Sequence, residues 1–178
     1  AKATKNLRLR PDELQISLQV SLGAKVLPEG ALCPFCGKTN IDPYGDHVTS
    51  CADAGHIVHT HDAYRDLLVA WCRTAGITVQ KEVTVQHAEG SYRADIVLPT
   101  GIPGFTSQTV LLDVTFRSPF TQTGMKKSSK EIGALAEAGE SDKDNRLKKK
   151  LEDVKYKFLP IAVETLGGIG KECAPFTE

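Results

Sequence analysis

Two aspartates occur where a folded chain would ordinarily bury only apolar side chains. Asp95 lies in the stretch "RADIVLP" and Asp113 in "TVLLDVTF". Buried like charges repel and must be neutralised by a cation, a proton or a basic side chain. Because Mg²⁺ suits a few carboxylates plus several waters, we expect the pair to hold Mg²⁺ or Mn²⁺. The alternative is structural, with Asp113 at a frayed strand end and Asp95 paired with Arg93.

A second set of residues has the spacing of a metal site. Three of the five cysteines fall within "CPFCGKTNIDPYGDHVTSC", in the pattern C-x2-C-x10-H-x3-C. Such a closed, sulfur-rich set favours a structural zinc ion with four protein ligands. The ligands that we expect are Cys33, Cys36, His47 and Cys51. Two alternatives stay open: reduced cysteines packed as small hydrophobic side chains, and replacement of His47 by His56, His59 or His61.

The elements that must position these residues follow from periodicity. Residues 61–76 have the apolar spacing of an amphipathic helix. Residues 77–86, 91–99 and 109–116 are rich in β-branched residues and read as three strands. Residues 129–156 are polar and helical in composition, and residues 157–168 form a last apolar strand that ends at glycines. The expected order is therefore helix, three strands, helix, strand.

Strand alternation predicts where the acids point. Asp113 should share a face with Thr115, and Asp95 with Arg93, so neighbouring strands would bring both carboxylates to one side of the sheet. In the first strand, we expect Glu82 on the polar face and the apolar side chains on the other. Those apolar side chains are Val79, Val83 and Val85.

Composition places the chain among globular proteins without a membrane span. It has 178 residues and a formal net charge of zero, and it lacks a run of roughly 20 apolar residues or a signal peptide. It does not begin with Met, so we expect a piece of a longer polypeptide. Basic residues concentrate between Lys126 and Lys157, which is typical of a solvated helix face or a nucleic-acid contact.

The order of these motifs resembles the PD-(D/E)XK nuclease superfamily, whose fold is restriction-endonuclease-like. More narrowly, it resembles the restriction-like endonuclease region of site-specific non-LTR retrotransposons and related reverse-transcriptase-linked proteins. The similarity runs from about residue 10 to residue 175. It includes C-x2-C, "GDH", "HDAYRDLL", Glu82, "RADIVL", "LLDVTF" and "FLPIAVETLGG".

The resemblance implies catalytic roles for particular residues. Asp95 and Asp113 correspond to the two motif acids, and Glu82 could join them. The lysine expected two positions after the second acid is absent, since Thr115 stands there; in the retroelement enzymes the basic residue lies on the following helix. A stripe of residues at helical spacing indicates Lys143 as the catalytic lysine, and Lys150 at its edge is the second candidate. The stripe comprises Ile132, Ala136, Gly139, Lys143, Leu147, Leu151 and Val154.

The resulting expectation is an α/β protein with a mixed sheet and the α-β-β-β-α-β core. Residues 1–56 would carry an N-terminal helix and the zinc-knuckle-like element, and residues 57–178 the nuclease. The implied activity is Mg²⁺-dependent nicking of double-stranded target DNA, in the nucleus, with RNA of the parent element as a second possible partner. The alternative is a catalytically inactive, zinc-containing module that binds DNA or RNA.

Overall fold

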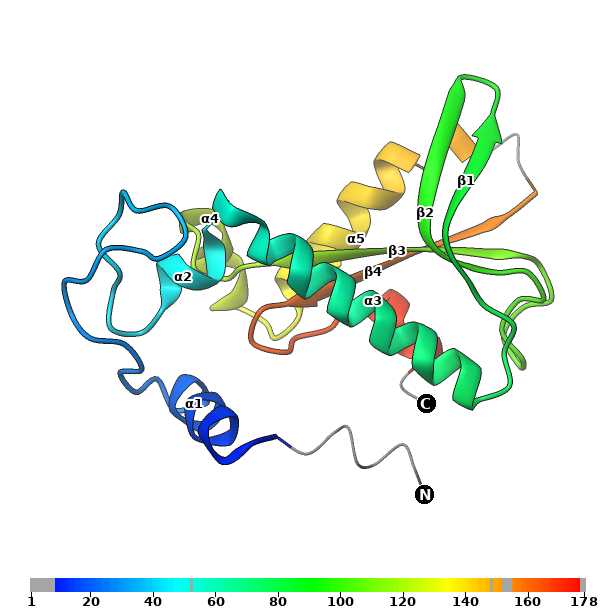
Figure 1. Cartoon of the computed structure of the whole chain (residues 1–178). Coiled ribbons are helices and arrows are strands. Elements are labelled where there is room, and N and C mark those ends of the chain that lie inside the picture. The colour runs from blue at the N-terminus through cyan, green and yellow to red at the C-terminus, as the bar shows by residue number, and fades with distance from the viewer. Residues whose placement is uncertain (1–8, 52, 148, 152–154, 177–178) are drawn as a thin grey trace. The chain divides into compact units, whose positions relative to one another are not determined.

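A computed structural model of the chain describes residues 9–51, 53–147, 149–151 and 155–176 (Figure 1). The chain divides into two compact units, Ala1–Ala54 and Gly55–Glu178. The first unit has a small buried cluster of Cys33, Ile41 and Cys51. The second has two larger apolar clusters. Among the described residues, no helix combines the length and the apolarity needed to cross a membrane.

The first unit is a helix followed by short, turn-rich segments. Helix α1 (Pro11–Ser21) begins with proline, whose missing N–H is not needed in the first turn. The side chain of Glu13 accepts a hydrogen bond from the Arg10 amide (2.8 Å), which closes that end. Helix α2 (Asp46–Ser50) and a 3₁₀ turn (Asp53–Gly55) follow.

The second unit is built on a four-stranded sheet in the order β1-β2-β3-β4. β1 pairs with β2, and β2 with β3, in antiparallel fashion, whereas β3 and β4 are parallel. The prediction of an α/β protein with a mixed sheet is therefore confirmed. The elements in chain order are α3 (His56–Thr74), β1 (Gln80–His87), β2 (Gly90–Leu98), β3 (Val110–Arg117), α4 (Gln122–Ser128), α5 (Ala134–Leu147) and β4 (Lys157–Glu164), with 3₁₀ turns at Lys149–Leu151 and Lys171–Phe176.

The helices cover opposite faces of the sheet. Leu68 and Cys72 of α3 join Leu112 of β3 in one apolar cluster. Leu111, the neighbour of Leu112, packs on the other face with Leu147 at the end of α5. This alternation of neighbouring residues is the period-two pattern of a strand buried on both sides. The sheet therefore has a core on each face, and β3 runs through its middle.

The sheet is not flat, because β2 leaves β3 partway along. β2 pairs with β1 from Gly90 onward, but with β3 only through Ile96–Leu98. In Figure 1 the far part of the β1–β2 hairpin turns steeply away from β3 and β4. The divergence begins at Asp95, the first β2 residue beyond its pairing with β3.

Glu82 marks the same bend on β1. Its φ of 56° lies in the left-handed region, which a residue with a side chain seldom adopts. The irregularity interrupts the alternation along the strand. Val79 packs with the α3-side cluster, whereas Val83 and Val85 belong to the α5-side cluster. The prediction that these three valines share one face is therefore wrong.

Helix α5 is shorter than the helical segment expected from composition. Ile132 precedes the helix and is 92% exposed, so it is not part of a buried stripe. Ala136 and Gly139 are buried, and Leu151 is buried after the helix has ended. Val154 lies outside the described residues. α4 was not expected from the sequence, because a seven-residue helix is too short to establish a clear period.

Candidate functional site

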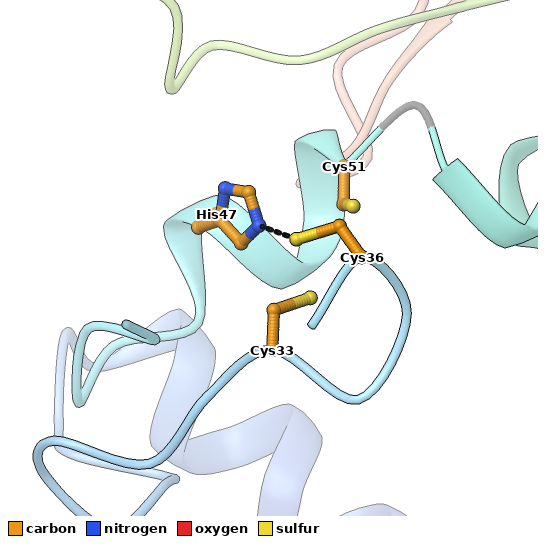
Figure 2. A group of neighbouring side chains, drawn as sticks. All are labelled: Cys33, Cys36, His47 and Cys51. Atoms are coloured by element: carbon orange, nitrogen blue, oxygen red, sulfur yellow. Dashed lines mark hydrogen bonds between the residues drawn. The ribbon is translucent and has the colours of Figure 1, made fainter. Parts of the chain in front are cut away.

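The predicted cysteine and histidine ligands converge in the first unit (Figure 2). The ligand atoms of Cys33, Cys36, His47 and Cys51 all lie within 4.8 Å of one another. Nε2 of His47 and Sγ of Cys36 are 3.4 Å apart. Tetrahedral bonds of about 2.0–2.3 Å to a zinc ion require ligand atoms at such separations. The cluster could therefore bind a metal such as zinc.

A tight turn presents the first two thiols. The Gly37 amide donates to the Cys33 carbonyl (2.8 Å), and the Cys33 amide donates to the Thr39 carbonyl (2.8 Å). Gly37 has a φ of 64°, a left-handed conformation that glycine adopts without steric cost. The turn thereby brings the side chains of Cys33 and Cys36 to the same side.

Asp42 positions the histidine. Its carboxylate accepts hydrogen bonds from the amides of Tyr44 (3.0 Å), Asp46 (3.1 Å) and His47 (2.9 Å). Desolvation raises the pKa of Asp42, but these amide donors outweigh it and hold the pKa below its ordinary value. The carboxylate thus caps the start of α2 and fixes the turn from which His47 projects.

The electrostatics of the cluster suit a cation. Hydrogen bonding from the Lys38 amide is the main cause that lowers the pKa of Cys36 to about 6. Burial instead raises the pKa of Cys51. Zinc binds thiolates, so a nearby cation would favour the ionised form of both.

Among the histidines whose side chains the structure describes, His47 alone belongs to this group. His61 belongs to the second unit, where it contacts Asp95, and His59 is exposed on α3. The side chain of His56 lies outside the described part of the chain. His47 is therefore the histidine that the structure brings to the cysteines.

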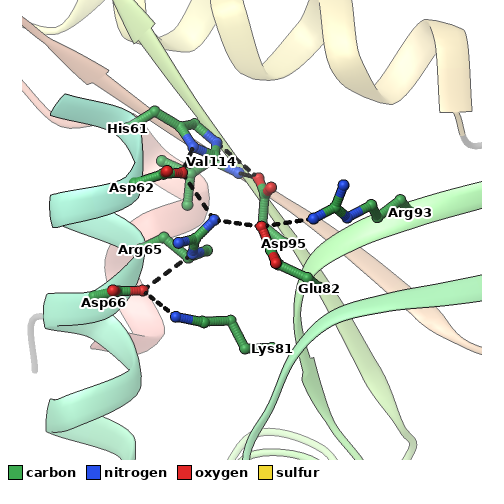
Figure 3. A network of polar contacts seen from close by, with 9 residues as sticks. All are labelled: His61, Asp62, Arg65, Asp66, Lys81, Glu82, Arg93, Asp95 and Val114. Carbon is green, nitrogen blue, oxygen red and sulfur yellow. Dashed lines mark hydrogen bonds and ion pairs between the residues drawn. The ribbon is translucent and has the colours of Figure 1, made fainter. Parts of the chain in front are cut away.

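Asp95 lies where β2 separates from β3 (Figure 3). Its Oδ2 accepts a hydrogen bond from the Val114 amide (2.7 Å), an amide that the departing strand no longer pairs. Nε2 of His61 on α3 donates to the same oxygen (3.0 Å). Among the described residues, no hydrogen-bond donor contacts Oδ1 of Asp95.

Asp113 is 5% exposed and faces α5. The hydroxyl of Tyr92 donates to its Oδ1, and Nζ of Lys143 forms an ion pair with its Oδ2. Desolvation, together with the charge of Asp113, raises the pKa of Tyr92, so the phenol stays a hydrogen-bond donor. The buried carboxylate is thus neutralised by a lysine from α5.

The two aspartates lie close together. The Val114 amide nitrogen follows Asp113 directly, so standard geometry puts Oδ2 of Asp95 within about 5 Å of Cα of Asp113. Desolvation raises the pKa of Asp95, but hydrogen bonds from His61 and Val114 and the charge of Lys143 bring it below its ordinary value. Lys143 therefore acts electrostatically on both carboxylates.

The prediction that both carboxylates lie on one side of the sheet needs correction. Asp95 contacts α3 and Asp113 contacts α5, so the pair occupies the bend between the two covered faces. The cause is the departure of β2, which turns Asp95 out of the regular alternation. The structural alternative of an Asp95–Arg93 salt bridge does not form, because Arg93 pairs with Glu82 (2.8 Å).

Glu82 sits between two guanidinium groups. Its Oε1 contacts Nη1 of Arg65 and Nη2 of Arg93, each at 2.8 Å. It is cross-strand from Asp95, since the pairs Lys81↔Ile96 and Val83↔Ala94 flank the two acids. The structure therefore brings Glu82 beside Asp95, but its carboxylate pairs with two arginines rather than with Lys143.

The other candidates lie elsewhere. Lys150 is exposed, beyond the end of α5. The carboxylate of Glu164 in β4 accepts hydrogen bonds from the amides of Leu135 (3.0 Å) and Ala136 (3.3 Å) and so caps the start of α5. Thr115 shares the side of β3 that faces α5 but lacks a basic group.

Two polar residues that contact the aspartates, Tyr92 and His61, were not predicted to lie there from the sequence. The sequence does not indicate a polar role for Tyr92, since tyrosine is common in β-strands and often packs in a core. The sequence indicates His61 only as an alternative zinc ligand. Its spacing of three and seven residues before Tyr64 and Leu68, which pack against the sheet, is the signal that places it on the sheet-facing side of α3.

Compared with known proteins, the chain matches no protein-family model and no curated protein sequence.

Proposed function

We propose that the Gly55–Glu178 unit is a divalent-metal-dependent endonuclease that nicks DNA, built on a PD-(D/E)XK-like core. The observation that supports this most is the grouping of two acids and one lysine at the bend of the sheet: Asp95, Asp113 and Lys143. These residue types are the ones that hydrolysis of a phosphodiester needs, namely carboxylates for a hard cation and a fixed positive charge.

The donor set fits Mg²⁺ or Mn²⁺. Both carboxylates are partly or fully buried, and Oδ1 of Asp95 receives no donor from the described residues. Asp95 and Asp113 would hold the ion. When bound, such an ion supplies positive charge to the scissile phosphate and lowers the pKa of a coordinated water.

The chain's own residues have separable roles in this proposal. Asp113 is held by Tyr92 and Lys143, so its carboxylate keeps one orientation. Lys143 carries a charge that can stabilise the negative charge growing on the phosphate. The basic residues between Lys126 and Lys157 would bind the DNA backbone, with an affinity that falls as salt rises.

The cellular role that we propose comes from the resemblance to the retroelement endonucleases. The unit would nick chromosomal DNA in the nucleus so that the freed 3′ end primes reverse transcription. The Cys33, Cys36, His47 and Cys51 cluster would hold structural zinc and grip flanking nucleic acid, either the target duplex or RNA of the parent element.

One observation favours a non-catalytic alternative. Each aspartate already has protein partners: Oδ2 of Asp95 contacts His61 and the Val114 amide, while Asp113 is hydrogen-bonded to Tyr92 and ion-paired with Lys143. A site that is neutralised internally does not need a cation to be stable. The chain would then be a zinc-containing module that binds DNA or RNA without cleaving it.

Nicking of supercoiled plasmid separates these two functions. The zinc-loaded chain should convert supercoiled to open-circle DNA with Mg²⁺ or Mn²⁺ and not with EDTA present. Asp95→Asn and Asp113→Asn should each abolish nicking while DNA binding persists. Glu89→Gln, in the exposed turn between β1 and β2, removes one carboxylate away from the site and should nick normally. Binding without any metal-dependent nicking by the wild type would leave the alternative.

A further inference from the structure

We propose that His61 is a positioning residue: it holds Oδ2 of Asp95 so that Oδ1 is presented to the divalent cation. This inference rests on the proposed nuclease function and adds a residue to it. Figure 3 shows the imidazole of His61 between α3 and the bend of the sheet, directed at Asp95.

The imidazole is itself held at both ring nitrogens. Nε2 lies 3.0 Å from Oδ2 of Asp95, and Nδ1 lies 3.3 Å from Oδ1 of Asp62. Asp62 in turn accepts a hydrogen bond from Nη1 of Arg65 (2.8 Å). Arg65 is 5% exposed, and Glu82 accepts from the same nitrogen (2.8 Å). The ring orientation is therefore fixed by a chain of contacts that ends in a buried guanidinium.

Two donors from different elements converge on one oxygen of Asp95. The Val114 amide of β3 and the His61 ring of α3 both donate to Oδ2. A single donor would leave the carboxylate able to rotate about its last torsion, which has a broad energy profile. Two donors to Oδ2 fix the rotation of the carboxylate. They hold Oδ2 toward His61 and the Val114 amide, and so direct Oδ1 away from α3.

A positioned carboxylate should bind a cation better than a rotating one. Residues that hold metal-binding side chains by hydrogen bonds typically change metal affinity by about 10–100-fold when replaced. His61 meets this description, since its ring contacts Asp95 and Asp62 and neither Asp113 nor Lys143. The role differs from direct ligation, in which the ring itself would bind the ion.

Two amide substitutions of His61 test whether a hydrogen-bond donor must reach Asp95. His61→Gln can place its Nε2 near the position of the imidazole Nε2, whereas His61→Asn is one methylene too short. Mn²⁺ affinity of the zinc-loaded chain, measured by electron paramagnetic resonance of the free ion, should fall about 10–100-fold in His61→Asn and stay close to wild type in His61→Gln. His59→Asn, exposed on the same helix, should match the wild type.

The outcomes distinguish failure of the positioning role of His61 from failure of the proposed nuclease function. Wild-type affinity in His61→Asn overturns the positioning role, and equal weakening in both His61 variants overturns it in favour of direct ligation. Far-ultraviolet circular dichroism and zinc content show whether each variant is folded. If Asp95→Asn binds Mn²⁺ as tightly as the wild type, the proposed nuclease site fails, whatever His61 does.

Discussion

Lys143 of α5 and Asp113 of β3 form an ion pair at the bend where β2 leaves β3. The lysine comes from a helix that follows the strand, rather than from two positions beyond the acid, where Thr115 stands. A helix packed on the sheet can thus return a positive charge to the same carboxylate that a strand lysine would reach.

Replacing Lys143 by Met should impair catalysis more than binding. The methionine keeps much of the side-chain volume but removes the charge that stabilises the transition state. Loss of one such group typically costs about 10²–10³ in rate. Single-turnover nicking rates at saturating Mg²⁺ measure this loss, and filter binding in EDTA measures affinity for DNA. Lys171→Met, at an exposed lysine outside the basic stretch from Lys126 to Lys157, is the control. Equal nicking by both variants would remove Lys143 from the site.

Tyr92 predicts a stability effect. Tyr92→Phe leaves Oδ1 of the buried Asp113 without its hydrogen-bond donor, which should cost about 1–3 kcal/mol of unfolding free energy. The single tryptophan, Trp71, lies in the second unit, so its fluorescence during urea unfolding reports on that unit. The exposed Tyr156→Phe should change stability by much less. Equal stability of both variants would show that the Tyr92–Asp113 bond contributes nothing.

Helical periodicity found Lys143 even though part of the stripe was misplaced. Gly139 and Leu147 lie at the expected spacing from Lys143 and face the sheet or its rim. The prediction that Ile132 belongs to the stripe was wrong because the helix starts two residues later, at Ala134. A period of 3.6 residues survives an error at one end, so a central residue is predicted more reliably than the boundary.

The bend could not be predicted from alternation. A period of two assigns a face to every residue only while the strand stays regular. Glu82 adopts a left-handed φ and β2 leaves β3 at Asp95, and no residue nearby is a glycine or proline that would mark the break. The contacts of Glu82 with Arg65 and Arg93, and of Asp95 with His61, depend on that break. They were therefore visible only in the structure.

The zinc proposal predicts loss of metal from a cysteine variant. Cys33→Ser removes one of four ligands and should lower the zinc content from about one ion per chain to near zero. Cys72→Ala, in the core of the second unit, removes a cysteine without touching the cluster. Elemental analysis of the purified proteins gives the answer. Full zinc content in Cys33→Ser would refute the site.

Two alanine variants, one at His47 and one at His59, test which histidine binds the zinc. His47→Ala should release zinc to a chelator faster than the wild type, whereas His59→Ala should behave as the wild type. Because binding energy of a closed site is also folding energy, His47→Ala should destabilise the first unit as well. The reverse order of the two variants would assign the site to another histidine.

Glu140 predicts a pH dependence. It is 5% exposed on α5, and desolvation raises its pKa above the ordinary value of 4.5. A carboxyl group with a raised folded pKa contributes stability that is complete below its unfolded pKa and is lost as pH rises through the folded pKa. Glu140→Gln should therefore gain stability relative to the wild type as pH rises above the ordinary glutamate pKa, measured by urea unfolding. Parallel curves for the two proteins would contradict this assignment, and Glu89→Gln is the exposed control.

The central claim is that Asp95 and Asp113 share one divalent ion. Anomalous diffraction from a crystal soaked in Mn²⁺ tests it most directly. We expect a single peak at about 2.0–2.3 Å from an oxygen of each carboxylate, with Lys143 beside Asp113. A saturating soak that gives no peak between the two aspartates, or a peak bound by only one of them, would contradict the claim.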